Sequence, residues 1–295
     1  MERIAKIAKI PFQLITTDHL VDRLWFLDDE DYKAGMNGVA VTAYRTETGI
    51  LSFILMSNHV HFVICGTQEK AEFFIDEYKR HHSAYLQRRY GFKEYLRRND
   101  VDYQQLEEEN ESLEKAVAYV QMNSVAANIC LHPTGYPWGT GNAFFKTTAV
   151  VGRRIGSLSA RSQIKILQSK THLPENYLVS NGYVLPESFV QVPYVESIFR
   201  TPARFNYFLV NSSKAKRRLQ SEDTGMPAFR DQSILAAIPD LCHSLFQKTK
   251  LEELNWYQQA EIAKQLRRRF SSEIHQLARV TGLPYPEIAK MLDIF

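Results

Sequence analysis

Two histidines separated by a single residue stand inside an apolar run of the chain. His59 and His61 belong to the segment Leu55–Ile64, whose hydrophobic residues predict a strand. Alternate side chains of a strand project from the same face, so the two imidazoles should lie roughly 7 Å apart on one surface. Such a pair can bind one divalent metal ion, but paired histidines on a half-buried strand also occur as ordinary hydrogen-bonded groups.

A tyrosine and an asparagine follow at helical spacing. Tyr119 and Asn123 lie four residues apart within Leu113–Ile129, whose periodicity predicts a helix, so they share one helix face. If that face is turned toward the histidines, Asn123 offers an amide oxygen as a third metal ligand and Tyr119 a phenolic nucleophile. Histidine and asparagine ligands with open positions suit Mg²⁺ or Mn²⁺ acting on a phosphate. The alternative is that Tyr119 is a core aromatic residue.

Strands and helices must be mixed along the first half of the chain to position these side chains. Enrichment in Val, Ile, Phe and Leu predicts strands at 38–43 and 50–65, and the second of these carries the histidines. An amphipathic helix is predicted at 71–90. The helix that carries Tyr119 follows an acidic run at 107–111, which favours a helix N-terminus. This mixture predicts an α+β domain.

The composition is that of an ordinary globular protein. The chain has 295 residues, of which 44% are hydrophobic and 23% charged, and this excludes collagenous, low-complexity and wholly disordered proteins. At roughly 150 residues per domain, the length predicts two domains. Gly and Pro residues interrupt the periodicity at 132–141, so we expect a boundary near residue 150, between a domain at 1–150 and an accessory region at 151–295.

The C-terminal part of the accessory region is predicted to be mainly helical. Helical periodicity is strongest at 251–270, and two shorter helices at 271–280 and 286–292 flank a turn at Thr281–Leu283. The layout of residues 271–293 fits a helix-turn-helix that binds DNA. A plain two-helix hairpin gives the same pattern.

Positive charge is unevenly distributed along the chain. The net charge is +3, but residues 1–150 carry 16 Lys and Arg against 20 Asp and Glu, which gives −4, and residues 151–295 carry 20 against 13, which gives +7. The second half is therefore the better surface for a nucleic-acid backbone, although solvated helix faces explain single basic clusters equally well. The basic residues that we consider as DNA contacts are Lys79, Arg80, Arg88, Arg89, Lys214, Lys216, Arg217, Arg218, Arg267, Arg268 and Arg269.

The sequence predicts a cytoplasmic protein without a membrane span. The stretch Thr48–Gln68 is free of Lys, Arg, Asp and Glu, but it contains serines, an asparagine and both histidines, whose burial in lipid would be costly. Residues 1–11 alternate charge and isoleucine, unlike a secretory signal. The three cysteines form no CxxC, so we expect neither a disulfide scaffold nor a cysteine zinc site.

Several blocks of the first half resemble the HUH single-tyrosine transposases, which include the REP-associated tyrosine transposases. Met56–Val63 resembles the Met-Pro-Asn-His-Val-His signature of that family, and Ala118–Asn128 its later Tyr-Ile-x-x-Asn-Pro-Val-Arg-Ala block. Tyr136–Gly139 resembles its Tyr-Pro-Trp-Ser tail, and Phe26–Tyr32 its early acidic turn. The resemblance covers about residues 10–145, and the blocks occur in the order and spacing of the family.

The chain departs from the family pattern at a few positions. Ser57 and Ser124 stand where prolines are usual, and Ala126 stands where an arginine is usual, so a phosphate contact is lost and DNA affinity or substrate choice should differ. The Gly-His-Leu-Trp-Gln-Gly-Arg stretch of many relatives is not recognisable between Gly91 and Tyr103. The residues that the family uses for catalysis all have counterparts in this chain.

The resemblance implies a ferredoxin-like antiparallel sheet with helices and a metal-dependent enzyme that cleaves and rejoins single-stranded DNA at hairpin-bearing element ends. Tyr119 would attack the scissile phosphate and leave a 5′-phosphotyrosine and a free 3′-OH. His59, His61 and Asn123 would bind Mg²⁺ or Mn²⁺. Covalent capture conserves the energy of the phosphodiester bond. Relatives include monomers and swapped homodimers, in which the tyrosine of one chain serves the histidines of the other.

Three other functions are compatible with the same residues. A domesticated regulator would bind hairpin DNA without transposition activity. A replication-initiation or plasmid-mobilisation nuclease would use the same metal pair, but such enzymes usually place the tyrosine before the histidines or carry a second tyrosine nearby. A metallohydrolase would turn over without a covalent adduct, so a cleavage assay separates these functions.

Overall fold

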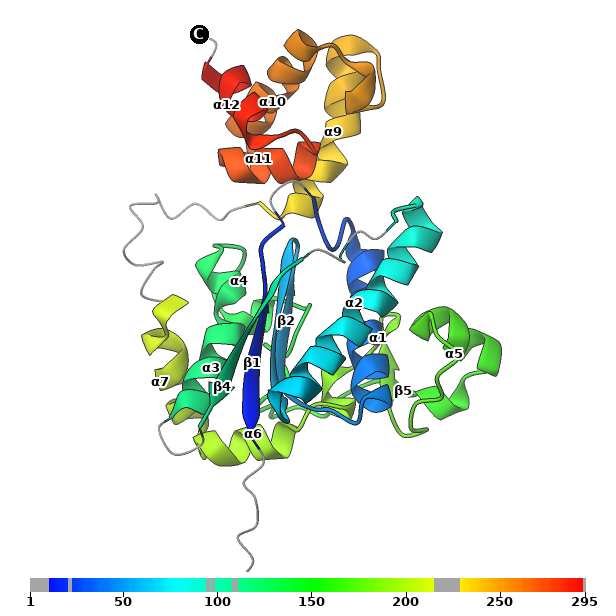
Figure 1. Cartoon of the computed structure of the whole chain (residues 1–295), viewed down its shortest axis with the longest axis vertical. Coiled ribbons are helices and arrows are strands. Elements are labelled where there is room, and N and C mark those ends of the chain that lie inside the picture. The colour runs from blue at the N-terminus through cyan, green and yellow to red at the C-terminus, as the bar shows by residue number, and fades with distance from the viewer. Residues whose placement is uncertain are drawn as a thin grey trace, which may run out of the picture.

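The computed structural model consists of an α+β body and a helical unit that lies against one end of it (Figure 1). It describes residues 11–20, 23–93, 96, 99–107, 111–214 and 229–293. The described residues up to 214 form the body, and those from 229 onward form the helical unit. The two histidines, Tyr119 and Asn123 all belong to the body.

A four-stranded antiparallel sheet forms the centre of the body. Its spatial order is β2-β3-β1-β4, and the body begins with the βαββαβ connectivity of ferredoxin-like folds. The prediction of an α+β fold is therefore confirmed. The strands are β1 (Phe12–Thr17), β2 (Gly49–Met56), β3 (His59–Cys65) and β4 (Val101–Leu106).

Helices cover both faces of this sheet (Figure 1). On one face, Phe62 of β3 packs against the rings of Phe74 and Tyr78. Because side chains alternate along β3, His59 and His61 point to the opposite face. The helices of the Phe62 face are α1 (Asp29–Arg45) and α2 (Gln68–Tyr90), and those of the histidine face are α3 (Ser112–Gln121) and α4 (Asn123–Ala126).

The predicted strand at 38–43 is wrong, because these residues lie in α1. The side chain of Asp28 caps this helix by accepting a hydrogen bond from the backbone N–H of Asp31, and the acidic residues of the first turn interact favourably with the helix dipole. Gly35 allows a close approach to Phe26, whose ring would lie 2.5 Å from a β-carbon at this position. The valine-rich stretch is therefore buried on a helix that packs tightly, not on a strand.

The predicted strand at 50–65 is a hairpin of β2 and β3. Ser57 and Asn58 form the turn, so His59 begins a strand instead of lying inside one. Strands β1 and β4 were not predicted from the sequence. The side chains of β4 are mostly half-buried or exposed, as expected for an edge strand with a weak hydrophobic pattern.

The predicted helix at 113–129 is interrupted. α3 ends at Gln121, Met122 departs from helical geometry with φ −82° and ψ 0°, and α4 ends at Ala126. The Asn123 side chain donates to the carbonyl oxygens of the preceding turn, and such bonds compete with the helical hydrogen-bond ladder. The predicted helix at 71–90 is confirmed by α2.

A segment around residue 139 closes the outer edge of β2. The backbone N–H of Leu55 donates to the carbonyl oxygen of Trp138 (2.8 Å), and that of Thr140 to the carbonyl oxygen of Phe53 (3.0 Å). A β-carbon on Gly139 would lie 2.6 Å from the Phe53 carbonyl oxygen, so the close approach requires glycine. This part of the chain therefore holds in place the strand on which α3 packs.

The segment 151–214 wraps around the rest of the body and shares its core. The buried apolar side chains of residues 155–209 belong to the same cluster as those of the sheet. The amide of Asn37 in α1 ties the segment down by donating to the carbonyl oxygens of Ile166 (2.9 Å) and Gly182 (3.1 Å). Its elements are β5 (Arg153–Arg154), α5 (Ala160–Leu167), β6 (Leu178–Ser180), β7 (Tyr183–Val184), α6 (Val192–Phe199) and α7 (Pro202–Asn211).

The helical unit has a hydrophobic core of its own, formed by buried side chains between residues 234 and 291. The buried residues of the first core extend to Leu209 and those of the second begin at Ile234, so the two cores do not divide at the expected boundary near residue 150. The prediction of a helical C-terminal region is confirmed. Within the described ranges, no helix is both long and apolar enough to cross a bilayer. The helices of the unit are α9 (Asp231–Phe246), α10 (Trp256–Phe270), α11 (Ile274–Thr281) and α12 (Tyr285–Asp293).

Candidate active site

His59 and His61 lie side by side at the start of β3, on the sheet face that α3 covers. Their ring centroids are 4.8 Å apart and their ring planes are nearly perpendicular. Alternate residues of a strand are roughly 7 Å apart along the backbone, so the shorter distance between the centroids means that the two rings lean toward each other. His59 is 5% exposed and His61 is 1% exposed, so a ligand that binds both would be largely shielded from water.

The hydrogen bonds of the two rings leave one nitrogen of each without a partner. The Nδ2 of Asn58 donates to the Leu20 carbonyl oxygen (2.9 Å), which orients the amide so that its Oδ1 accepts from Nδ1 of His59 (2.9 Å). Thr16 Oγ1 and His61 Nδ1 form a hydrogen bond of 3.0 Å. The Nε2 atoms of both histidines are buried and unpaired among the described residues. Metal-binding histidines are commonly held in this way through the other ring nitrogen.

Burial keeps both imidazoles neutral. Burial is the main cause that lowers the pKa of His61 to about 3, and the charges of Lys214 and His19 lower it further, while Asn123 acts in the opposite direction. Burial, followed by the charge of His61, holds the pKa of His59 well below its ordinary value. A neutral imidazole has the lone pair that a metal ion requires, so the pair can bind a metal at neutral pH.

α3 brings Tyr119 next to the histidines. The ring centroids of Tyr119 and His61 are 5.5 Å apart, and their planes are nearly perpendicular. Tyr119 is half-buried and not enclosed in the core. The Nζ of Lys214 lies 4.9 Å from the centroid of the Tyr119 ring, which places a positive charge beside the phenol.

Asn123 is almost fully buried one turn beyond Tyr119. Its Nδ2 donates to the carbonyl oxygens of Tyr119 (2.9 Å) and Val120 (3.3 Å), so the donor group is satisfied within the helix. Asn123 also raises the pKa of His61, as expected when its amide oxygen faces that ring. The amide oxygen is therefore the group that Asn123 offers to a ligand.

The donor set fits a divalent cation. Two imidazole nitrogens and one amide oxygen suit an ion such as Mg²⁺ or Mn²⁺, with further positions left for water or phosphate oxygens. In the part of the chain that the structure describes, no three His, Cys, Asp or Glu side chains converge on a metal-binding arrangement. A metal at this site would thus depend on His59, His61 and Asn123 together with ligands from the substrate or solvent.

A buried hydrogen-bond network fixes α3 against β2. The Nε2 of Gln121 donates to Ser52 Oγ (2.8 Å) and to Thr140 Oγ1 (2.6 Å), and all three side chains are buried. Buried and fully paired networks of this kind make an arrangement rigid. Gln121 therefore helps to fix the positions of Tyr119 and Asn123 relative to the strands.

Three further residues of the site were missed by the sequence analysis. His19, just after β1, stacks flat on His59 with a ring-centroid distance of 3.7 Å and is itself exposed. Thr16 and Asn58 hold the two histidine rings. Asn58 could have been found, because it lies inside the block that resembles the family signature. His19 and Thr16 come from the unpredicted strand β1 and its end.

The helical unit contacts the turn that precedes β3. Ser57 Oγ donates to Asp231 Oδ2 (2.6 Å), and the same carboxylate accepts hydrogen bonds from Gln276 Nε2 (2.9 Å) and Arg279 Nε (3.2 Å). Ser57 is one of the residues that depart from the family pattern. In this structure its hydroxyl is used to join the two units.

The predicted basic face of α2 lies on the opposite side of the sheet from the histidines. Lys79 is only 9% exposed, and its ammonium group donates to the carbonyl oxygen of Asn99. Arg89 forms ion pairs with Asp28 (2.6 Å) and Asp31 (2.5 Å). Both cations are thus engaged in contacts that stabilise the body, and we leave them out of the proposed DNA surface.

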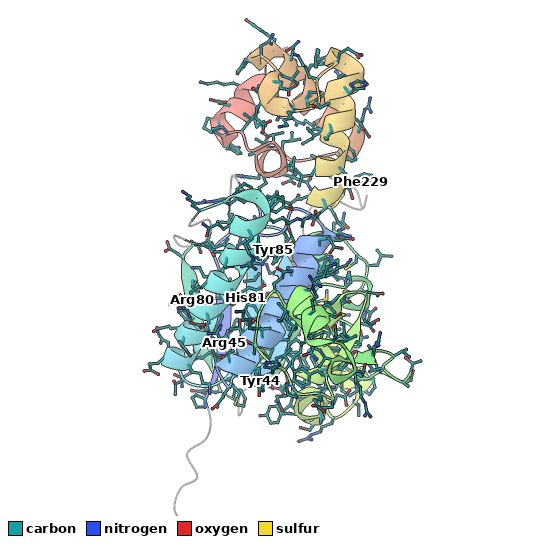
Figure 2. The ribbon with its side chains drawn as sticks, turned by 90° about the vertical axis from the view of Figure 1, so that its right-hand side faces the viewer. Tyr44, Arg45, Arg80, His81, Tyr85 and Phe229 are labelled. Carbon is teal, nitrogen blue, oxygen red and sulfur yellow. The ribbon has the colours of Figure 1, made fainter. Side chains whose placement is uncertain are left out.

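Arg80 and Arg88 are exposed on the same helix. Figure 2 shows Arg80 near Arg45 on the outer face of α1 and α2, where both arginines pair with Glu77. Arg88 donates to Oε1 of Gln168 (3.3 Å). These residues could only contact DNA that passes behind the sheet, away from Tyr119.

The structure describes Lys214 and the three arginines of α10 among the other candidate DNA contacts. Lys214 is next to Tyr119, and residues Lys216, Arg217 and Arg218 lie outside the described residues. Arg267, Arg268 and Arg269 are exposed in the last turn of α10.

Most of the net positive charge of the second half belongs to the segment 151–214. Residues 151–214 carry 8 Lys and Arg against 3 Asp and Glu, a net charge of +5. Residues 215–295 carry 12 against 10, a net charge of +2. A long-range attraction for DNA therefore comes mainly from the wrapping segment, and the helical unit can contribute only local contacts.

Comparisons with known proteins add no family assignment. No family model matches the chain, and searches of curated proteins and of solved structures give no significant match.

Proposed function

We propose that this chain is a metal-dependent transposase or endonuclease of the HUH single-tyrosine type, acting on single-stranded DNA next to hairpins. The proposal depends on one observation: the buried, unpaired Nε2 atoms of His59 and His61 share a sheet face with the ring of Tyr119. Asn123 adds an amide oxygen at the same place. A nucleophile beside two imidazoles and an oxygen ligand for a divalent ion can support metal-assisted phosphoryl transfer through a covalent intermediate.

In this proposal, the phenolic oxygen of Tyr119 attacks the scissile phosphorus. A P–O bond to Tyr119 forms, the P–O3′ bond breaks, the phenol loses its proton, and the leaving 3′ oxygen takes up a proton. The products are a 5′-phosphotyrosine and a free 3′-OH, and attack by the 3′-OH of another strand reverses the exchange and rejoins DNA. A bound Mg²⁺ or Mn²⁺ would supply positive charge that polarises the phosphate. Lys214 adds a protein cation beside the phenol.

We propose that the helical unit binds the paired stem of the hairpin. α11 and α12 are joined by a short turn in which Gly282 has φ +70°, in keeping with the expected helix-turn-helix. α12 exposes Tyr285, Glu287 and Lys290, and the exposed arginines of α10 lie in the same unit. An enzyme of this kind acts on cellular DNA, so we place it in the cytoplasm.

The decisive experiment is a search for a covalent adduct. A hairpin oligonucleotide with unpaired flanks is labelled at its 3′ end or at its 5′ end and incubated with the protein and Mn²⁺. We expect the 3′ label to migrate with the denatured protein and the 5′ label to appear on a shorter free strand. Tyr119→Phe and an excess of chelator should both abolish the adduct while the hairpin is still bound.

Each other outcome points to a different function. Tight hairpin binding with no cleavage under any divalent metal would favour the regulator. Cleavage without an adduct would favour a metallohydrolase. An adduct that persists in Tyr119→Phe would assign the nucleophile to another tyrosine.

A further inference from the structure

A pocket of about 160 Å³ lies where the helical unit meets the body, directly beside the candidate active site. The body contributes His19 and His59 to its lining, and α9 and α11 of the helical unit form the facing wall with residues that include Gln276 and Arg279. Figure 2 shows Phe229, another lining residue, at this junction. The pocket exists only because the two units are docked.

The charged groups at this pocket are already paired. Asp231 is 4% exposed, and its carboxylate accepts hydrogen bonds from Ser57 and Arg279. Arg230 forms an ion pair with Asp29 (2.9 Å). Because each arginine faces a carboxylate, the pocket has little net charge with which to attract a phosphate. It is better suited to an uncharged polar ligand.

Flat rings and amide groups are the remaining recognition elements. His19 is exposed and stacks on His59, and Phe229 is 46% exposed. Gln232 and Gln276 each use the amide nitrogen to donate to a backbone carbonyl, while their oxygens accept no hydrogen bond from the described residues. Aromatic rings stack on nucleobases, and amide oxygens accept hydrogen bonds from base N–H groups.

We propose that this pocket takes one unpaired nucleobase of the DNA strand that is cut. The inference rests on the proposed function and extends it, because the helical unit then reads the single strand at the active site as well as binding the stem. The pocket borders His59, so the bound base lies close to the phosphate that Tyr119 attacks. Its volume of about 160 Å³ suits one base better than a base pair.

The test combines an abasic scan of the DNA with a variant that blocks the pocket. Each unpaired position of the hairpin substrate is replaced in turn by an abasic site, and the adduct yield is measured. Ala127→Trp fills the pocket from the body side, because Ala127 is exposed, lines the pocket and takes no part in the bonds between the units. Leu131→Trp, at a position 84% exposed and outside the pocket, is the matched control.

We expect one abasic position near the cut to lower the adduct yield of the wild type about tenfold, the scale of one lost stacking contact. Ala127→Trp should lower the adduct yield with intact DNA by a similar factor. In this variant, the abasic site at the same position should cause no further loss of yield. Leu131→Trp should behave like the wild type. Non-additivity of this kind reports a direct interaction.

A second readout does not depend on the chemistry. In a Tyr119→Phe background, 2-aminopurine at the sensitive position should lose fluorescence on binding, and Ala127→Trp should remove most of this quenching. If adducts form but every abasic position is tolerated, the pocket proposal fails and the proposed function stands. If intact DNA gives no adduct, the proposed function fails and the pocket proposal falls with it.

Discussion

Ser57 Oγ and Asp231 Oδ2 are 2.6 Å apart, and their hydrogen bond joins two residues that are 174 positions apart in the chain. Ser57 lies in the turn directly before the strand that carries the histidines, and Asp231 is the first residue of α9. The orientation of the helical unit is therefore coupled to the start of the candidate metal site by one short contact.

Replacing this hydroxyl should loosen the junction between the units. A hydrogen bond to a charged group stabilises by about 1.5–3 kcal/mol, so Ser57→Ala should raise the undocked population at least tenfold. Amide hydrogen exchange should become correspondingly faster at the start of α9. Ser197→Ala removes a surface hydroxyl that bonds within α6 and serves as the control. Unchanged exchange in α9 would show that the other interdomain contacts suffice.

The candidate metal site can be tested by removing its proposed ligands one at a time. His59→Ala and His61→Ala should each abolish divalent-metal-dependent cleavage, and Asn123→Ala should weaken it less, because imidazole binds Mn²⁺ more strongly than a neutral amide does. Calorimetric titration with Mn²⁺ gives the affinities directly, with the exposed His243→Ala as control. Wild-type Mn²⁺ affinity in His61→Ala would rule out the site.

The parts of the site that face each other belong to one chain. The Tyr119 and His61 rings that lie 5.5 Å apart come from the same molecule, so a monomer has a complete set of groups. An equimolar mixture of Tyr119→Phe and His61→Ala should therefore form no adduct. In a swapped homodimer, by contrast, the intact tyrosine of one variant would meet the intact histidines of the other. Recovery of adduct formation in the mixture would show that arrangement.

Stability should fall on acidification because of buried histidines. His82 of α2 is fully buried among aromatic rings, and burial lowers its pKa to about 4, although its bond to the Trp25 carbonyl oxygen opposes the shift. In the unfolded chain the same group titrates near 6.5. The unfolded state therefore binds more protons below pH 6.5, and the free energy of unfolding falls as the pH drops toward 4.

Between pH 7 and pH 5 this one histidine should lower the free energy of unfolding by about 2 kcal/mol. Urea denaturation of the wild type and of His82→Gln at both pH values measures the effect. The variant can be less stable overall, but its loss of stability between the two pH values should be smaller by about that amount. Equal losses in both proteins would contradict the assignment.

The arginines at the end of α10 should contribute to binding of the hairpin stem. On duplex DNA, each lost phosphate contact reduces the magnitude of the slope of log affinity against log salt concentration by about 0.9. Replacing Arg267, Arg268 and Arg269 by Gln should therefore reduce this magnitude by about 2 to 3, so that binding depends less on salt. Binding of an unpaired strand should change less. Arg80→Gln, on the far side of the sheet, is the control. An unchanged slope would assign the three arginines to another role.

Local pattern was enough to predict part of this arrangement. Alternation along a strand placed His59 and His61 on one face, and the spacing of Tyr119 and Asn123 placed them one helical turn apart, which is how the structure has them. The strand predicted at 38–43 was wrong. β-branched residues favour a strand when only the local sequence is considered, but here tertiary packing buries them on a helix.

The rest of the site depends on contacts between distant parts of the chain. His19 reaches His59 only through the pairing of β1 with β3, and Asp231 reaches Ser57 only when the helical unit docks. The partners of Lys79 and Arg89 likewise come from other elements, so a sequence pattern could not show that these cations are engaged. Such contacts leave no periodic signal along the sequence.

The presence of one tyrosine beside the histidines has a kinetic consequence. Tyr32 and Tyr136, which line the neighbouring pocket, are buried, and burial raises the pKa of both, so neither is a ready nucleophile. While Tyr119 holds one strand end, the described part of that chain has no second attacking group at the site. In the proposed reaction, cutting both element ends before they are joined would then require two molecules on one DNA, so the rate of double cutting should rise with the square of the protein concentration, whereas a single cut should be first order in protein.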